Sequence, residues 1–159
     1  RSTQAKTLFP YTTLFRSLTM SIPAPLTEEV HLMISRALEQ SWSERTSVCF
    51  NPSIAPRSYG QCAQTAIAVF ETFGGEILRT EVQKRDGTSI RHFYNRISGQ
   101  RYDFTADQFN IPDYWNELTY KDIKSNVSEA LTETLPGQMG AMRSAFAVAW
   151  QKTTGGNGH

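Results

Sequence analysis

The sequence is poor in cysteine and histidine and has no long apolar run, and each shortage excludes a class of protein. Two cysteines in 159 residues cannot form the disulfide framework of a small secreted domain. The three histidines lie far apart, and none has a second ligand at metal-binding spacing, so we expect no metal and no other cofactor. No apolar run approaches the ~20 residues that cross a bilayer, so we expect no membrane partner.

The chain also lacks a block of like charge. Its 16 lysines and arginines and 15 acidic residues are mixed along the sequence, and the net charge is +1. Binding to nucleic acid usually needs basic residues gathered on one surface or segment, so we expect no nucleic-acid partner. Because no export signal is evident, the two thiols predict a reducing, cytoplasmic location.

The first 19 residues do not match the rest of the chain. Residues 7–17, TLFPYTTLFRS, lack the apolar centre of a signal peptide, because Pro10 and two threonines interrupt it. The string resembles an in-frame translation of a short-read sequencing adapter. We therefore interpret residues 1–19 as a non-native leader that packs poorly, with Met20 as a candidate start. Without residues 1–17 the net charge becomes −2, because three basic residues are removed.

Residues 20–152 are predicted to form one α+β domain, followed by a frayed polar tail over residues 153–159. Apolar residues at helical spacing predict three main helices, over residues 26–42, 60–73 and 137–152. Alternating apolar residues and glycine-containing turns predict three antiparallel strands, over residues 76–84, 89–97 and 100–104. Shorter helices are predicted at a Thr-Ala-Asp-Gln capping box and further along, over residues 105–108 and 128–135. The expected fold is a central helix on a small antiparallel sheet, with flanking helices.

A thiol at the start of a buried helix is followed in the sequence by a histidine and an aspartate on successive strands. Cys62 is expected in the first helical turn, where the helix dipole and unpaired backbone N–H groups favour the thiolate. His92 can accept the thiol proton and later protonate a leaving group. Asp103, across a tight hairpin, can hold the imidazole by its other nitrogen. This order is that of compact papain-like and transglutaminase-like cores.

Each of these residues also has a purely structural interpretation. Cys62 fits a buried small apolar residue, His92 a half-exposed strand residue, and Asp103 a turn or helix-capping residue. Asn95 is the alternative orienting residue, although on a regular strand it faces the side opposite to His92. Cys49 is a weaker candidate nucleophile, because it lies in a loop with no helix start beside it.

Four local strings, in their order along the chain, resemble the YunG-like family of small, largely uncharacterised bacterial proteins. They are SWSERTS, GQCAQTA, FGGEILRT and HFYNRISGQRYDFTADQF. The resemblance covers about residues 41–109. The sequence departs from the family pattern with Phe93 in place of tyrosine and Phe104 in place of leucine, and both changes are conservative.

The resemblance implies a papain-like core and a cysteine hydrolase or acyltransferase that acts on an amide, peptide or isopeptide bond. Cys62 would be the nucleophile, His92 the general base and acid, and Asp103 the orienting residue. The Gln61 side chain and the Cys62 backbone N–H are candidates for the oxyanion site, because donors at a helix start face the developing negative charge. The partner would be an unknown peptide or small amide substrate. The alternative is a non-enzymatic binding or accessory module on the same core.

Overall fold

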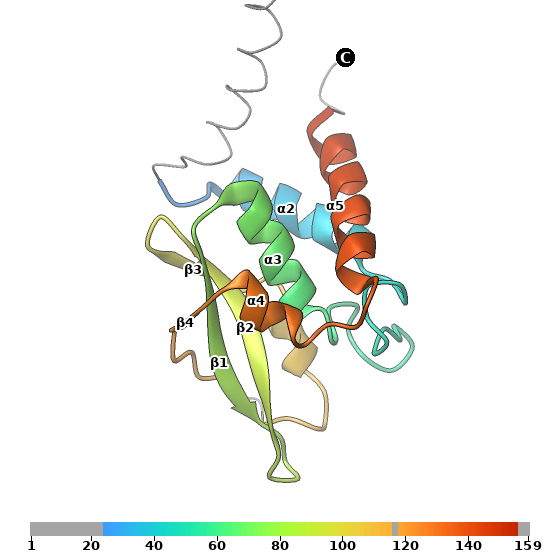
Figure 1. Ribbon diagram of the computed structural model, residues 1–159, viewed down its shortest axis with the longest axis vertical. Helices are drawn as coiled ribbons and strands as arrows, with labels where there is room; N and C mark the ends of the chain where they lie inside the picture. Colours follow the sequence, from blue (N-terminus) through green and yellow to red (C-terminus); the bar gives the residue numbers. More distant parts are fainter. Residues whose placement is uncertain (1–23, 116–117, 156–159) are drawn as a thin grey trace, which may run out of the picture.

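The structure, a computed structural model, describes residues 24–115 and 118–155. Within these residues the fold consists of four α-helices and a four-stranded antiparallel sheet, with α3 lying along the sheet (Figure 1), which confirms the α+β class. The helices are α2 (Glu28–Ser41), α3 (Cys62–Phe73), α4 (Val127–Leu131) and α5 (Gln138–Gly155), and η1 (Ala106–Phe109) is a short 3-10 helix. The strands are β1 (Glu76–Gln83), β2 (Ser89–Ile97), β3 (Gln100–Tyr102) and β4 (Ile123–Ser125).

The sequence predicted a poorly packed leader at one end of the chain and a frayed tail at the other. Residues 1–19, interpreted above as a leader, lie outside the described residues. Helix α5 continues to Gly155, so residues 153–155 of the predicted tail are helical, and residues 156–159 lie outside the described residues. The hydroxyl groups of Thr153 and Thr154 donate to carbonyl oxygens one helical turn earlier, at 2.8 and 2.9 Å, which satisfies these polar residues inside the helix.

The sheet has the strand order β3-β2-β1-β4, and all three neighbouring pairs are antiparallel. The predicted Asp-Gly turn joins β1 to β2, where the backbone N–H of Gly87 donates to the carbonyl oxygen of Lys84 at 3.0 Å. Strand β4 was not predicted, because three residues are too few to show an alternating pattern. The β1–β2 hairpin is therefore the long central element, and β3 and β4 are its short edges.

Helix α3 is the central helix, as the sequence predicted. It packs on β2 and β1 and also contacts α4 and α5, while α2 and α5 pack on each other (Figure 1). Ala66, Ile67 and Val69 are buried along its length. The helix ends at Gly74, whose N–H still donates to the Phe70 carbonyl oxygen and whose left-handed φ of 76° turns the chain out of the helix.

The sheet is covered on both faces, and this divides the side chains of β2. Phe93 and Ile97 join the large apolar core on the α3 side, and Asn95 donates from its side-chain amide to a carbonyl oxygen of α3 at 2.9 Å. Because side chains alternate along a strand, His92 faces the other side, where its ring packs edge-on against Phe109 with centroids 4.7 Å apart. The second face therefore carries the candidate site.

The Thr-Ala-Asp-Gln segment forms a short helix as predicted, but the predicted capping box is wrong. Helix η1 begins after Thr105, whose side chain makes no capping hydrogen bond. Instead, the amide nitrogen of Gln108 donates to the carbonyl oxygen and the hydroxyl oxygen of Thr105, both at 3.0 Å. Strand β3 ends at Tyr102, two residues before its predicted end, so Asp103 lies in the turn between β3 and η1.

Candidate active site

His92 and Asp103 are in direct contact. The imidazole Nε2 lies 2.6 Å from the Asp103 Oδ2, and the two side chains are 0% and 5% exposed. The histidine is therefore fully buried, and its interpretation as a half-exposed strand residue is wrong. Burial strengthens a hydrogen bond between an ionised carboxylate and an imidazole, because little water competes for either group.

The Asp103 carboxylate is held by two further residues. Its Oδ1 accepts from the backbone N–H of Thr105 at 3.1 Å and from the Thr105 hydroxyl at 3.4 Å. Its Oδ2 also accepts from the Tyr120 hydroxyl at 2.8 Å. Asp103 therefore both orients His92 and closes the turn into η1. Its interpretations as an orienting residue and as a turn residue both hold.

Sequence reasoning missed Tyr120, because it lies in a segment without regular periodicity. Burial, and then the negative charge and hydrogen bond of Asp103, raise the pKa of Tyr120 well above its ordinary value. The phenol therefore stays protonated and can only donate to the carboxylate. The Arg101 guanidinium lies over the Tyr120 ring, 4.4 Å from its centroid, and helps to hold it there.

Cys62 is the other ionisable side chain that acts on the imidazole. Burial alone lowers the pKa of His92, but the hydrogen bonds and negative charges of Asp103 and Cys62 outweigh it and raise the pKa to about 9. Asp103 contacts the ring directly at 2.6 Å, and the Cys62 thiol acts on it from the first residue of α3. Catalytic contacts of this kind are often long in unliganded enzymes and shorten when substrate binds.

The raised pKa of His92 predicts a pH-dependent stability. The group binds its proton more tightly in the folded chain than at its ordinary value of 6.5, so its contribution is complete below pH 6.5 and is lost as pH rises through about 9. A shift of this size corresponds to about 3 kcal/mol. We expect the free energy of unfolding in urea to fall over this range in the wild type, and to fall much less in His92→Gln. His31→Gln is the matched control, and parallel pH curves for all three proteins would contradict the assignment.

Cys62 is the first residue of α3, and a tight turn sets its position. Gly60 has a left-handed φ of 73°, and a Cβ there would lie 2.7 Å from the Ser47 hydroxyl oxygen and 2.8 Å from the Cys49 Cβ. The backbone N–H of Gln61 closes the turn on the Ser58 carbonyl oxygen at 3.0 Å. Only glycine fits this conformation and this space, so the loop before α3 and the start of the helix are locked together.

The remaining sequence candidates lie in different surroundings. The Gln61 side chain is fully buried, its amide nitrogen makes a long contact of 3.5 Å with the Ser43 carbonyl oxygen, and its Oε1 has no partner in the described residues. Its role in an oxyanion site stays a prediction that requires the amide to turn. Asn95 is engaged with α3 and does not orient His92. Cys49 is exposed on the preceding loop.

Tyr114 and Trp115, neighbours in the loop after η1, lie in different surroundings. Tyr114 is 2% exposed, and burial first, followed by Tyr59, Asp113 and Cys62, raises its pKa well above the ordinary range. It therefore packs in the core, as most aromatic loop residues do. Trp115 is 55% exposed and lies under the Arg85 guanidinium, 4.6 Å from the ring centroid.

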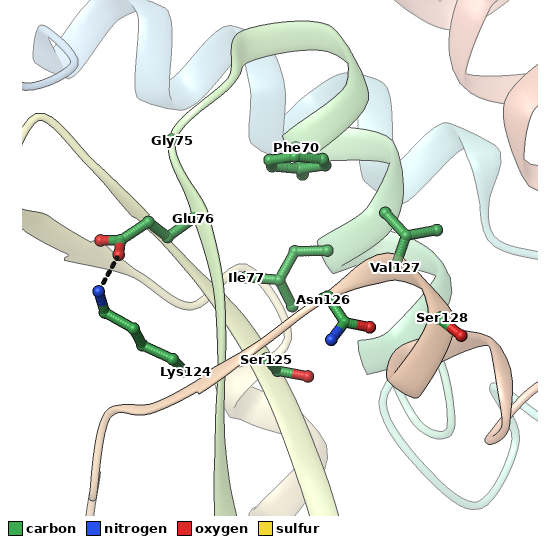
Figure 2. Close-up of a pocket in the computed structure, with 9 residues that line it drawn as sticks. All are labelled: Phe70, Gly75, Glu76, Ile77, Lys124, Ser125, Asn126, Val127 and Ser128. Atoms are coloured by element: carbon green, nitrogen blue, oxygen red, sulfur yellow. Dashed lines mark ion pairs between the residues drawn. The ribbon is translucent and has the colours of Figure 1, made fainter.

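A separate pocket with a volume of about 470 Å³ lies between the end of α3, the start of β1 and the β4–α4 connection. Figure 2 shows that its apolar side chains, Phe70, Ile77 and Val127, point toward one another. Glu76 and Lys124 form an ion pair of 3.7 Å on the other side of β1. None of the residues of the candidate site lines this pocket.

The side chains and helices of the described residues bear on two classes of function, metal binding and membrane insertion. Among these residues, no group of three or more histidine, cysteine or acidic side chains is arranged to hold a metal ion. No helix in the same part of the chain has the length and apolar character needed to cross a membrane.

The profile of the YunG protein family matches residues 31–151, which span the whole candidate site. The chain belongs to the YunG family. The protein described as "Uncharacterized protein YunG" from Bacillus subtilis (strain 168) is 37% identical over 110 residues, which are 69% of this chain and 85% of that protein. The resemblance seen in the local strings is thereby confirmed at the level of the YunG family. No solved structure matches the chain significantly.

Proposed function

We propose that this YunG family member is a cysteine hydrolase or acyltransferase with a papain-like core, in which Cys62 is the nucleophile. The observation that carries the proposal is a buried imidazole with Asp103 on one nitrogen and an interacting thiol at a helix start. A thiol at a helix N-terminus, a histidine beside it and a third group that orients the histidine are the usual features of an activated cysteine. The substrate class is an amide, peptide or isopeptide.

The chemistry follows from the positions of the protons. His92 takes the proton of Cys62, and the thiolate sulfur forms a bond to the substrate carbonyl carbon. The imidazolium then gives this proton to the leaving amine as the C–N bond breaks, which leaves a thioester on Cys62. In the second half of the reaction, the oxygen of water or the nitrogen of an acceptor amine attacks the thioester carbon while His92 takes a proton from the attacking molecule. The C–S bond then breaks, and His92 returns the proton to the Cys62 sulfur, which restores the thiol.

Two groups support these steps without changing covalently. Asp103 holds the imidazole and stabilises its positive charge, and Tyr120 and Thr105 hold Asp103. The first N–H groups of an α-helix have no intrahelical acceptor, so the backbone N–H of Cys62 is the candidate donor to the tetrahedral oxygen. Both cysteines are free thiols, and such a nucleophile functions in a reducing compartment, which supports a cytoplasmic location.

Covalent labelling distinguishes an enzyme from a binding module. We expect iodoacetamide and a small activated ester such as p-nitrophenyl acetate to modify Cys62 at least tenfold faster than Cys49 at pH 7, although Cys49 is the more exposed thiol. Peptide mass spectrometry after timed quenching measures both rates in one sample. Cys49→Ser should keep the fast reaction, and Cys62→Ser should lose it. Equal rates at the two thiols would favour a non-enzymatic module in which Cys62 only packs.

A further inference from the structure

We propose that Gln108 is a positioning residue that sets the protonation of the His92 imidazole and connects it to the turn before Cys62. Gln108 is 2% exposed and lies in η1. Its amide nitrogen lies 3.3 Å from the His92 Nδ1, and its amide oxygen accepts from the backbone N–H of Gly60 at 3.4 Å. One buried side chain therefore contacts both the candidate base and the turn that positions the candidate nucleophile.

The partners of Gln108 determine which amide atom faces the imidazole. A carbonyl oxygen can only accept a hydrogen bond, so the atom 3.0 Å from the Thr105 carbonyl oxygen must be the NH₂ group. A backbone N–H can only donate, so the atom facing Gly60 must be the amide oxygen. Both contacts require the same orientation of the amide. The NH₂ group has two hydrogens, so one serves the carbonyl and hydroxyl oxygens of Thr105, both at 3.0 Å, and the other is presented to the Nδ1 of His92 at 3.3 Å.

This orientation selects one tautomer of the neutral histidine. A neutral imidazole has one N–H donor and one acceptor nitrogen. The Asp103 carboxylate, 2.6 Å from Nε2, favours the proton on Nε2. The donor on Gln108 favours an unprotonated Nδ1. His92 is then held with Nδ1 as its basic nitrogen, and this is the nitrogen that remains to accept the Cys62 proton.

The same contact acts against the charged form of His92. Once Nδ1 carries a proton, it faces the NH₂ group of Gln108, and the two donors cannot hydrogen-bond to each other. Gln108 therefore limits how strongly the acidic groups around the ring favour the imidazolium. The Gln108 variants keep the other titratable side chains that act on the ring or on its carboxylate partner. These are Asp103, Cys62, Tyr94 and Tyr120. The catalytic importance of this balance rests on the proposed function, but the protonation itself is measurable without substrate.

The test is a ¹⁵N–¹H NMR titration of the His92 ring in the wild type and in two variants. Gln108→Met keeps the length of the side chain and removes the donor, and Gln108→Glu places a carboxylate beside Nδ1. We expect the neutral wild-type ring to carry its proton on Nε2. We expect the His92 pKa to rise in Gln108→Met and to rise by about one unit or more in Gln108→Glu.

Gln64→Met is the matched control, because Gln64 is an equally buried glutamine that donates to the Thr46 carbonyl oxygen and not to His92. It should leave the His92 pKa unchanged. A neutral wild-type ring protonated on Nδ1, or a His92 pKa that rises in neither Gln108 variant, overturns the proposal. If Gln108→Glu does not fold, the Gln108→Met titration decides the question by itself.

The outcomes separate this proposal from the proposed function. If Cys62 shows no selective labelling but the His92 pKa rises in the Gln108 variants, the hydrolase proposal is wrong and the role of Gln108 stands. If Cys62 is labelled selectively and the His92 pKa does not respond to Gln108, the hydrolase proposal stands and the role of Gln108 is wrong.

Discussion

Replacing His92 by alanine is expected to lower the rate of Cys62 alkylation at pH 7 by about tenfold or more, because an unassisted thiol is only a few per cent ionised there. The effect on ester turnover should be larger, about 10²- to 10⁴-fold, since the same imidazole also activates the water that hydrolyses the thioester. Timed labelling with iodoacetamide gives the first number. Release of p-nitrophenol from p-nitrophenyl acetate gives the second.

His92→Ala also removes the partner of a buried carboxylate, so loss of reactivity must be separated from loss of fold. Leaving Asp103 without its imidazole costs stability, because a buried charge then has one hydrogen bond fewer. Circular dichroism and the denaturation midpoint of each variant provide this check. His31→Ala, a histidine on α2 that stacks on Phe104, is the matched control and should react like the wild type. If the His92→Ala protein is folded and its Cys62 is labelled at the wild-type rate, His92 does not act as the base for Cys62.

The second large effect is expected at Gly75, where α3 connects to β1. Gly75 has a φ of 81°, and a Cβ there would lie 2.3 Å from the Arg96 carbonyl oxygen. Alanine would therefore meet backbone that belongs to the central hairpin and cannot move without disturbing the sheet. We expect Gly75→Ala to lower the free energy of unfolding by about 3 kcal/mol or more. The loss combines the cost of alanine in a left-handed backbone conformation with the cost of a steric clash like that of an overpacked core.

Gly99→Ala is the matched control for this substitution. Gly99 also has a left-handed φ, of 79°, but a Cβ added there would meet no other part of the described chain within 4 Å. It should lose only the conformational term, about 1 kcal/mol. Urea denaturation of both variants at one pH measures the difference. Similar losses at the two glycines would show that the close approach to Arg96 does not limit the connection.

Local sequence patterns were enough to predict most of the elements. Thr27, a typical N-cap residue, precedes the first helix, and its side chain accepts from the backbone N–H of Val30 at 3.2 Å. A glycine pair follows Phe73, glycine is typical of helix ends, and Gly74 ends α3. These features depend on neighbours within one turn of the chain, so a sequence string carries nearly all of the information. Strand β4 was missed because it is defined by its pairing with β1 and not by its own pattern.

The site was predictable in its residue types but not in its contacts. Cys62, His92 and Asp103 were singled out because their order matched a known chemistry, while Gln108 was assigned to a helix cap. In the fold, Gln108 turns its amide toward His92 from 16 residues away, and Tyr120 reaches Asp103 from 17 residues away. No short pattern encodes these two contacts.

The sequence by itself determined the α+β class, the central helix with its thiol in the first turn, and the membership of the YunG family. These follow from periodicity, from turn residues and from local strings. Only the tertiary structure decided that His92 is fully buried, that Asp103 rather than Asn95 holds it, and that a glutamine faces its other nitrogen. The physical reason is that burial and hydrogen bonding belong to pairs of side chains on different elements. Such pairs form only when the helices and loops pack on the two faces of the sheet and bring distant side chains together.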